Sequence, residues 1–154
     1  MTEPAAFESV DDILDFAIAR EQESVQFYTS LSQKVEHAPM KKVFEQFARE
    51  EKGHQAKLER VKEGKRMLPL QRRVMDLKMA EYLVAEASDA EMDYQQALIV
   101  AMKKEKKAFK LYSDLAAWVE DEKLATLFSG LAQEEAKHKL RFEIEYDENI
   151  LTDN

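Results

Sequence analysis

The sequence of 154 residues contains no cysteine, only three glycines and only three prolines. The lack of cysteine excludes disulfide bonds, thiolate catalysis and cysteine-ligated zinc or iron. The scarcity of glycine and proline leaves little turn signal for a fold of many short strands. Long apolar runs are also missing, and none approaches the roughly 20 residues that a transmembrane helix needs.

The balance of charge is acidic, with a formal net charge of −8. A negative protein is repelled by nucleic acid and by anionic membranes, so we expect neither as a partner. The first eight residues have no basic segment followed by an apolar one, so we expect no signal peptide and a cytoplasmic protein. The content of 45% apolar and 35% charged residues suits long amphipathic helices in a single domain, residues 1–154.

One short sequence motif occurs twice in the chain. Residues 50–54 read Glu-Glu-Lys-Gly-His and residues 134–138 read Glu-Glu-Ala-Lys-His, 84 positions later. The same shift places Glu21 on Glu105 and Tyr28 on Tyr112 without a gap. The sequence therefore predicts two copies of one helical hairpin, over residues 9–64 and 93–148, separated by a crossover at 65–92.

Local signals predict where the helices of each hairpin begin and end. Ser9 is a good N-cap for the first helix, which should stop near residues 37–38 because Pro39 disfavours helix in the residue before it. Gly64 is a plausible C-cap for the second helix. Asp93 and Gln96 form a candidate capping box for the third helix, and the fourth should begin at about Glu122.

The crossover is far longer than a turn between antiparallel neighbours requires. Its length predicts that the second and third helices run parallel, so that a pseudo-two-fold axis relates the hairpins. The apolar period from Val74 to Val84 predicts a short helix within the crossover.

Six ionisable residues interrupt the apolar stripes of the four predicted helices, at steps of three and four from their apolar neighbours. They are Glu21, Glu51, His54, Glu105, Glu135 and His138. No lysine or arginine shares these stripes, and burying an unpaired carboxylate costs several kcal/mol. Two divalent cations would neutralise four carboxylates. Carboxylates with one imidazole per metal favour iron or manganese, and zinc would also bind.

Glu50 and Glu134 also lie one turn before a histidine. A stripe through Glu50 would continue through Lys57, whereas a stripe through Glu51 runs through Phe44 and Leu58. We therefore predict that Glu51 and Glu135 are the ligands, and that Glu50 and Glu134 are exposed or flank the site.

Two interpretations are open for other residues near the apolar stripes. Tyr28 and Tyr112 lie two turns beyond Glu21 and Glu105, where they could donate hydrogen bonds to ligand carboxylates or simply pack in the core. Four lysines surround Glu105 in the sequence, and a solvated basic face is the simpler reading of them: Lys103, Lys104, Lys106 and Lys107.

These motifs as a set resemble the di-iron domain of the rubrerythrin family, over about residues 9–148. One Glu from each of two helices and one Glu-x-x-His from each of the other two is a described ligand pattern of ferritin-like bundles. The resemblance implies an all-α, ferritin-like four-helix bundle with two iron ions, often as a homodimer. It also implies reduction of hydrogen peroxide with electrons from a rubredoxin-like centre.

The sequence departs from that family in two respects. A rubredoxin iron site needs four cysteines, so the electrons would come from a separate donor protein such as a rubredoxin. Met102 and Ala108 stand one turn on either side of Glu105, where rubrerythrins carry an additional carboxylate.

Three functions remain open from the sequence. The first is a redox enzyme that reduces peroxide or oxygen to water. The second is a ferroxidase, or an iron-binding or iron-storage protein. The third is a salt-bridged helical bundle without metal, which the predicted burial of four carboxylates disfavours. No sequence feature suggests the organic-substrate pocket of a monooxygenase.

Overall fold

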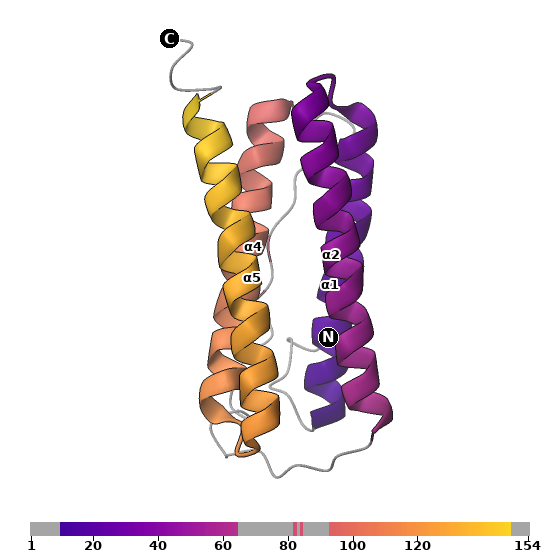
Figure 1. Cartoon of the computed structure of the whole chain (residues 1–154), viewed down its shortest axis with the longest axis vertical. Helices are drawn as coiled ribbons and strands as arrows, with labels where there is room; N and C mark the ends of the chain where they lie inside the picture. The colour runs from indigo at the N-terminus through magenta and orange to yellow at the C-terminus, as the bar shows by residue number, and fades with distance from the viewer. Residues whose placement is uncertain (1–9, 65–81, 83, 85–92, 149–154) are drawn as a thin grey trace, which may run out of the picture. The chain divides into compact units, whose positions relative to one another are not determined.

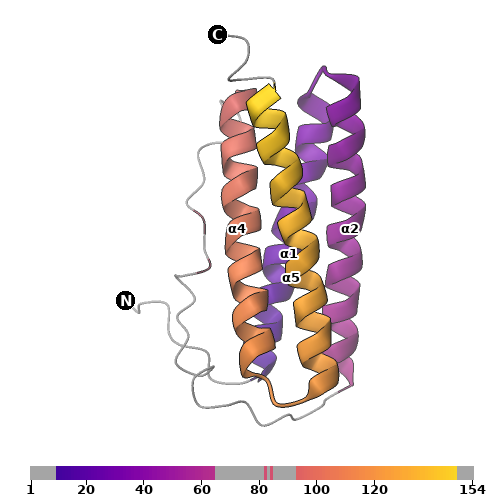
Figure 2. The same cartoon turned by 60° about the vertical axis from the view of Figure 1, so that its left-hand side comes forward.

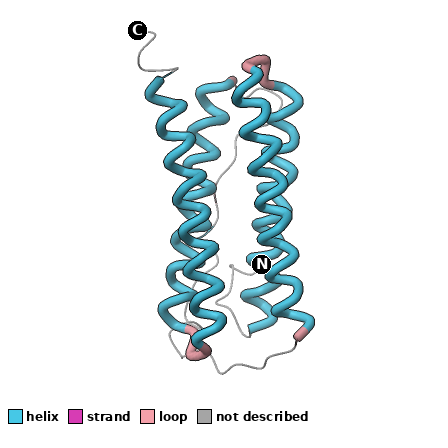
Figure 3. The backbone as a smooth tube through the Cα atoms, in the orientation of Figure 1, coloured by secondary structure: helices cyan, strands magenta, loops and turns pink. Residues whose placement is uncertain are grey.

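The computed structural model describes residues 10–64, 82, 84 and 93–148. Within these residues the structure has four long α-helices and no strand (Figure 3). The chain divides into two compact units, one of which contains residues 7–68 and the other residues 1–6 and 69–154. Each unit contains one helical hairpin, as the repeat predicts.

The first hairpin consists of α1 (Val10–Lys34) and α2 (Ala38–Glu63), which pack against each other and are joined at one end by a short loop (Figure 1). The first helix ends at Lys34, a few residues before the predicted stop, because residues 35–37 are needed to reverse the chain. His37 is the N-cap of α2, and Pro39 lies in its first turn, where a missing N–H costs nothing. Gly64 caps the helix in a right-handed conformation.

The second hairpin consists of α4 (Tyr94–Trp118) and α5 (Glu122–Tyr146), again side by side (Figure 2). The predicted capping box is present at Asp93 and Gln96, each side chain bonding the other's backbone N–H. The Asp121 carboxylate accepts a hydrogen bond of 3.0 Å from the Leu124 N–H and opens α5. These caps satisfy N–H groups that have no partner within their own helix.

The same aromatic pair stabilises both hairpins. Tyr28 of α1 stacks on Phe44 of α2, with ring centroids 6.2 Å apart and planes inclined by 14°. Tyr112 of α4 stacks on Phe128 of α5 at 6.3 Å and 13°. All four rings are buried. The 84-residue repeat seen in the sequence is therefore a repeat of packing as well.

Most of the predicted crossover at 65–92, including nearly all of the expected short helix, lies outside the described residues. The described Tyr82 is buried against α4, where its hydroxyl donates a 2.8 Å hydrogen bond to Asp114 Oδ2. The N-cap role predicted for Ser9 also falls outside the described residues, and the parallel course of the second and third helices stays a prediction. None of the described helices is long and apolar enough to cross a membrane.

Candidate metal centre

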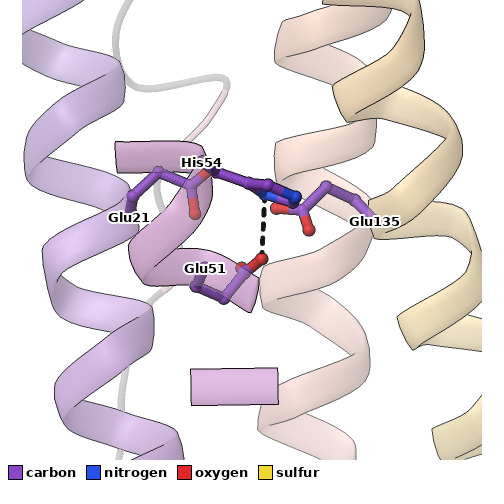
Figure 4. A group of neighbouring side chains, drawn as sticks. All are labelled: Glu21, Glu51, His54 and Glu135. Atoms are coloured by element: carbon purple, nitrogen blue, oxygen red, sulfur yellow. Dashed lines mark ion pairs between the residues drawn. The ribbon is translucent and has the colours of Figure 1, made fainter. Parts of the chain in front are cut away.

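The first half-site lies in the middle of the first hairpin. Glu21 extends from α1 towards Glu51 and His54 of α2, as Figure 4 shows. Their exposed fractions are 2%, 0% and 2%, so all three are inside the protein. The period of each helix accounts for this burial, since Glu51, His54 and Leu58 follow one another at steps of three and four on the buried stripe of α2.

The imidazole of His54 points its Nδ1 atom at both carboxylates. Nδ1 lies 3.1 Å from Glu51 Oε1, the ion pair drawn in Figure 4, and 3.5 Å from Glu21 Oε2. Burial lowers the pKa of His54, but hydrogen bonds to Glu21 and Glu51 outweigh it and raise the pKa to about 11. The two carboxylates thus create a strongly negative environment at this nitrogen.

The second half-site repeats the arrangement in the second hairpin. Glu105 of α4 meets Glu135 and His138 of α5, and all three side chains are buried. His138 Nδ1 lies 3.1 Å from Glu105 Oε2 and 3.4 Å from Glu135 Oε1. The shorter contact is here to the carboxylate of the other helix, whereas in the first half-site it is to Glu51 of the same helix.

The donor chemistry of each half-site fits a metal ion. Within each set of three residues, one ligand atom per residue lies within 4.8 Å of the others, so one cation could contact all three. Two carboxylates and one imidazole form a donor set that suits divalent iron, manganese or zinc. A cation would also compensate the burial of the carboxylates, which is otherwise costly. The buried carboxylate and histidine clusters could therefore hold metal.

The neighbouring residues follow the chosen helical phase. Glu50 and Glu134 are half-exposed, in contrast to the buried Glu51 and Glu135. Glu50 accepts a 2.6 Å hydrogen bond from Gln46, one turn earlier on α2. Both tyrosines are buried in the aromatic cores, and hydrogen bonding from them to ligand carboxylates stays a prediction.

One further buried carboxylate was not predicted from the sequence. Glu145 of α5 is only 2% exposed, and its Oε2 accepts a 2.6 Å hydrogen bond from the hydroxyl of Tyr94 on α4. Its Oε1 lies 3.7 Å from Arg141 Nη1. The available signal was the stripe of α5 itself, because Glu145 follows Phe142 by three positions. The Glu145 carboxylate already has Tyr94 and Arg141 as partners, so its role is structural and it is not part of the candidate metal centre.

Two helical hairpins, each with a buried Glu and Glu-x-x-His set, define the class of ferritin-like carboxylate proteins. The family model for rubrerythrin matches residues 12–146. This chain belongs to the rubrerythrin family, and the predicted fold class, an all-α ferritin-like four-helix bundle, is confirmed.

A solved structure of a hypothetical protein from Pyrococcus furiosus has a similar fold. The two chains share 27% sequence identity with a TM-score of 0.68, over 88% of this chain and 86% of that one. No curated protein sequence matches this chain.

Proposed function

We propose that this chain is a non-haem di-iron redox protein that reduces hydrogen peroxide or oxygen with electrons from a separate donor protein. The observation that carries the proposal is the duplicated half-site, with the same three ligand types buried in both hairpins. Membership of the rubrerythrin family supports it. We further propose that the protein acts as a homodimer, as the family resemblance suggests, and that it acts in the cytoplasm.

The proposed ligands are Glu21, Glu51 and His54 in one half-site and Glu105, Glu135 and His138 in the other. Iron, when bound there, supplies the reversible one-electron change that the protein side chains lack; manganese or zinc would be alternative occupants. The imidazole Nδ1 atoms would be the nitrogen ligands, since they already face the carboxylates. Burial of all six side chains excludes bulk water from the reacting centre.

The reaction requires protons as well as electrons. Hydrogen peroxide takes up two electrons and two protons to give two water molecules, and oxygen takes up four of each. The buried carboxylates are the nearest groups that can pass protons. Tyr28 and Tyr112 are proposed to assist by hydrogen bonding to them.

Uptake and oxidation of iron is the second candidate function. This second function is favoured by Met102 and Ala108, which flank Glu105 on α4 at the positions where rubrerythrins have an additional carboxylate. A ferroxidase or iron-storage protein would use the same six ligands without needing a dedicated electron donor.

Anaerobic loading with Fe²⁺, followed by stopped-flow mixing with peroxide and separately with oxygen, tests the proposal. Rapid oxidation by peroxide, with turnover when a reductant is supplied, is the expected result. Growth of a ferric mineral well beyond about two irons per chain would instead establish storage. A protein that binds iron but reacts with neither oxidant would refute the redox proposal.

A further inference from the structure

The exposed side of α4 carries an uneven distribution of charge. Lys103, Lys106, Lys107 and Lys110 lie close in sequence to the partly exposed Phe109, and we call these five residues the basic face. The spacing of three and four positions places the lysines along one side of the helix. They line a pocket of about 610 Å³, within the range of binding pockets in proteins.

The fold does not require this basic face. Like charges three or four positions apart on a helix repel one another and lower its stability. The repeat provides an internal comparison, because the same positions of α1 hold Ala19, Gln22, Glu23 and Gln26, with Val25 in place of Phe109. Since α1 presents its Glu21 without these lysines, the metal half-site does not need them either.

The basic face resembles the centre and rim of a transient protein interface. Phe109 is 41% exposed, and aromatic side chains of this kind are enriched at protein interfaces. One end of the rim is held in place, because Lys110 pairs with Asp114 at 3.1 Å and lies 4.9 Å from the ring centre of Tyr82. Lys103 and Lys106 are exposed towards the other end.

The charge of the basic face selects the partner. Four lysines and Asp114 give the pocket a net charge of +3, although the whole chain carries −8. A small acidic protein would be attracted to this face and repelled by the rest of the surface. Such complementarity fixes the docking orientation and raises the association rate.

The same helix carries a proposed metal ligand on its buried side. Glu105 is 1% exposed and lies directly before Lys106 in the sequence. A partner on the basic face would therefore be separated from the second half-site by about the 10–12 Å diameter of one helix. Short separation is what an external electron donor needs.

We propose that the basic face is the docking surface for a small acidic electron-carrier protein that reduces iron at the second half-site. This inference rests on the proposed function. Each one-electron carrier is oxidised as one ferric ion is reduced to the ferrous form. Two such transfers supply the two electrons that convert peroxide, with two protons, to two water molecules.

Binding of a reduced acidic rubredoxin to the iron-loaded chain, measured by calorimetry at low and high salt, tests the surface. The double variant Lys103→Glu/Lys106→Glu should weaken binding about tenfold or more and reduce its salt dependence. The control, Lys41→Glu/Lys42→Glu, makes the same charge change on exposed residues of α2 and should change the affinity less than about twofold. Phe109→Ser should weaken binding with an unchanged salt dependence, and melting curves would verify that each variant folds.

Several results would contradict the proposal that the basic face is a docking surface. Equal weakening in the α2 control, no effect of the α4 variant, or no binding to the wild type would each do so. Saturable binding of dodecanoate at this face without rubredoxin binding would indicate a small-molecule site instead. A dimer of this chain that only the α4 variant disrupts would identify a second copy as the occupant.

The peroxide reaction is measured separately with dithionite as the reductant. If dithionite drives no turnover but rubredoxin still binds, the proposed function is rejected while the proposed docking surface is retained. Normal dithionite-driven turnover in the Lys103→Glu/Lys106→Glu variant, together with slow turnover from rubredoxin, is the expected result.

Discussion

His138 Nδ1 lies 3.1 Å from Glu105 Oε2, so a buried imidazole of α5 meets a buried carboxylate of α4. The equivalent pair of the first hairpin, His54 Nδ1 and Glu21 Oε2, is 3.5 Å apart. In both hairpins the histidine therefore links the two helices through a carboxylate of its neighbour.

We predict that the chain binds about two metal ions, because each hairpin supplies a complete set of two carboxylates and one imidazole. Elemental analysis after anaerobic loading with Fe²⁺ and removal of free metal would give the stoichiometry. His54→Ala and His138→Ala, one in each hairpin, should both lower it. A wild-type limit of one ion per chain would contradict two functional half-sites.

Substitution of two adjacent glutamates, Glu50 and Glu51, should show which of them is the metal ligand. Glu51→Ala should abolish metal binding in the first half-site, because it removes a buried ligand beside His54. Glu50→Ala, in which the lost carboxylate is half-exposed and bonded to Gln46, should retain it. The reverse result in titrations with Fe²⁺ would mean that Glu50, and not Glu51, is the metal ligand on α2. Glu135→Ala and Glu134→Ala provide the same comparison in the second hairpin.

Metal should raise the melting temperature and should bind less tightly as the pH falls. Metal bound only by the folded state stabilises it by about 2.7 kcal/mol when the free ion is about 100 times Kd. Protons compete for the same carboxylate and imidazole atoms, so binding should release protons into the solution. Calorimetry in buffers of different ionisation enthalpy would count them. Equal melting temperatures with and without metal would show that the carboxylates do not hold it.

Removal of all four ligand carboxylates should have opposite effects on binding and stability. The quadruple variant with leucine at positions 21, 51, 105 and 135 should lose metal binding. Without metal it should melt at or above the temperature of the wild type, because four buried carboxylates that repel one another are replaced by apolar groups. Thermal melts of both proteins in chelator would compare them. A large fall in the melting temperature of the variant would show that the carboxylates stabilise the fold without metal.

The contact between Tyr94 and Glu145 should make stability depend on pH in alkaline solution. Burial and then the hydrogen bond to Glu145 raise the pKa of Tyr94 well above its usual value of about 10. A raised folded-state pKa gives stability that is complete below about pH 10 and is lost as the pH rises further. Tyr94→Phe should cost about 1 kcal/mol at pH 7, and the difference from the wild type should narrow above pH 10.

Urea unfolding of both proteins between pH 7 and 11 would measure that difference. Tyr146→Phe is the matched control, because its hydroxyl takes part in a longer and exposed hydrogen bond, which it accepts at 3.3 Å from Gln95. The control should lose less stability at pH 7. A constant difference between Tyr94→Phe and the wild type across this range would contradict the raised pKa.

The sequence alone determined the hairpins and the candidate ligands. The period within each helix is a local property, so the stripe through Phe44 and Leu58 was enough to prefer Glu51 over Glu50. The repeat then identified Glu105, Glu135 and His138 as equivalents of the first set. Capping at Asp93 was also predictable, because it depends on residues only three positions apart.

Only the tertiary structure decided which groups meet across helices. The preference of His138 Nδ1 for Glu105 over Glu135 depends on how α4 and α5 pack, which no spacing within one helix specifies. The same holds for the burial of Glu145 under Tyr94, 51 positions earlier, and for the packing of Tyr82 on α4. Contacts of this kind arise when side chains from distant segments share one space, because their geometry follows from close packing rather than from period.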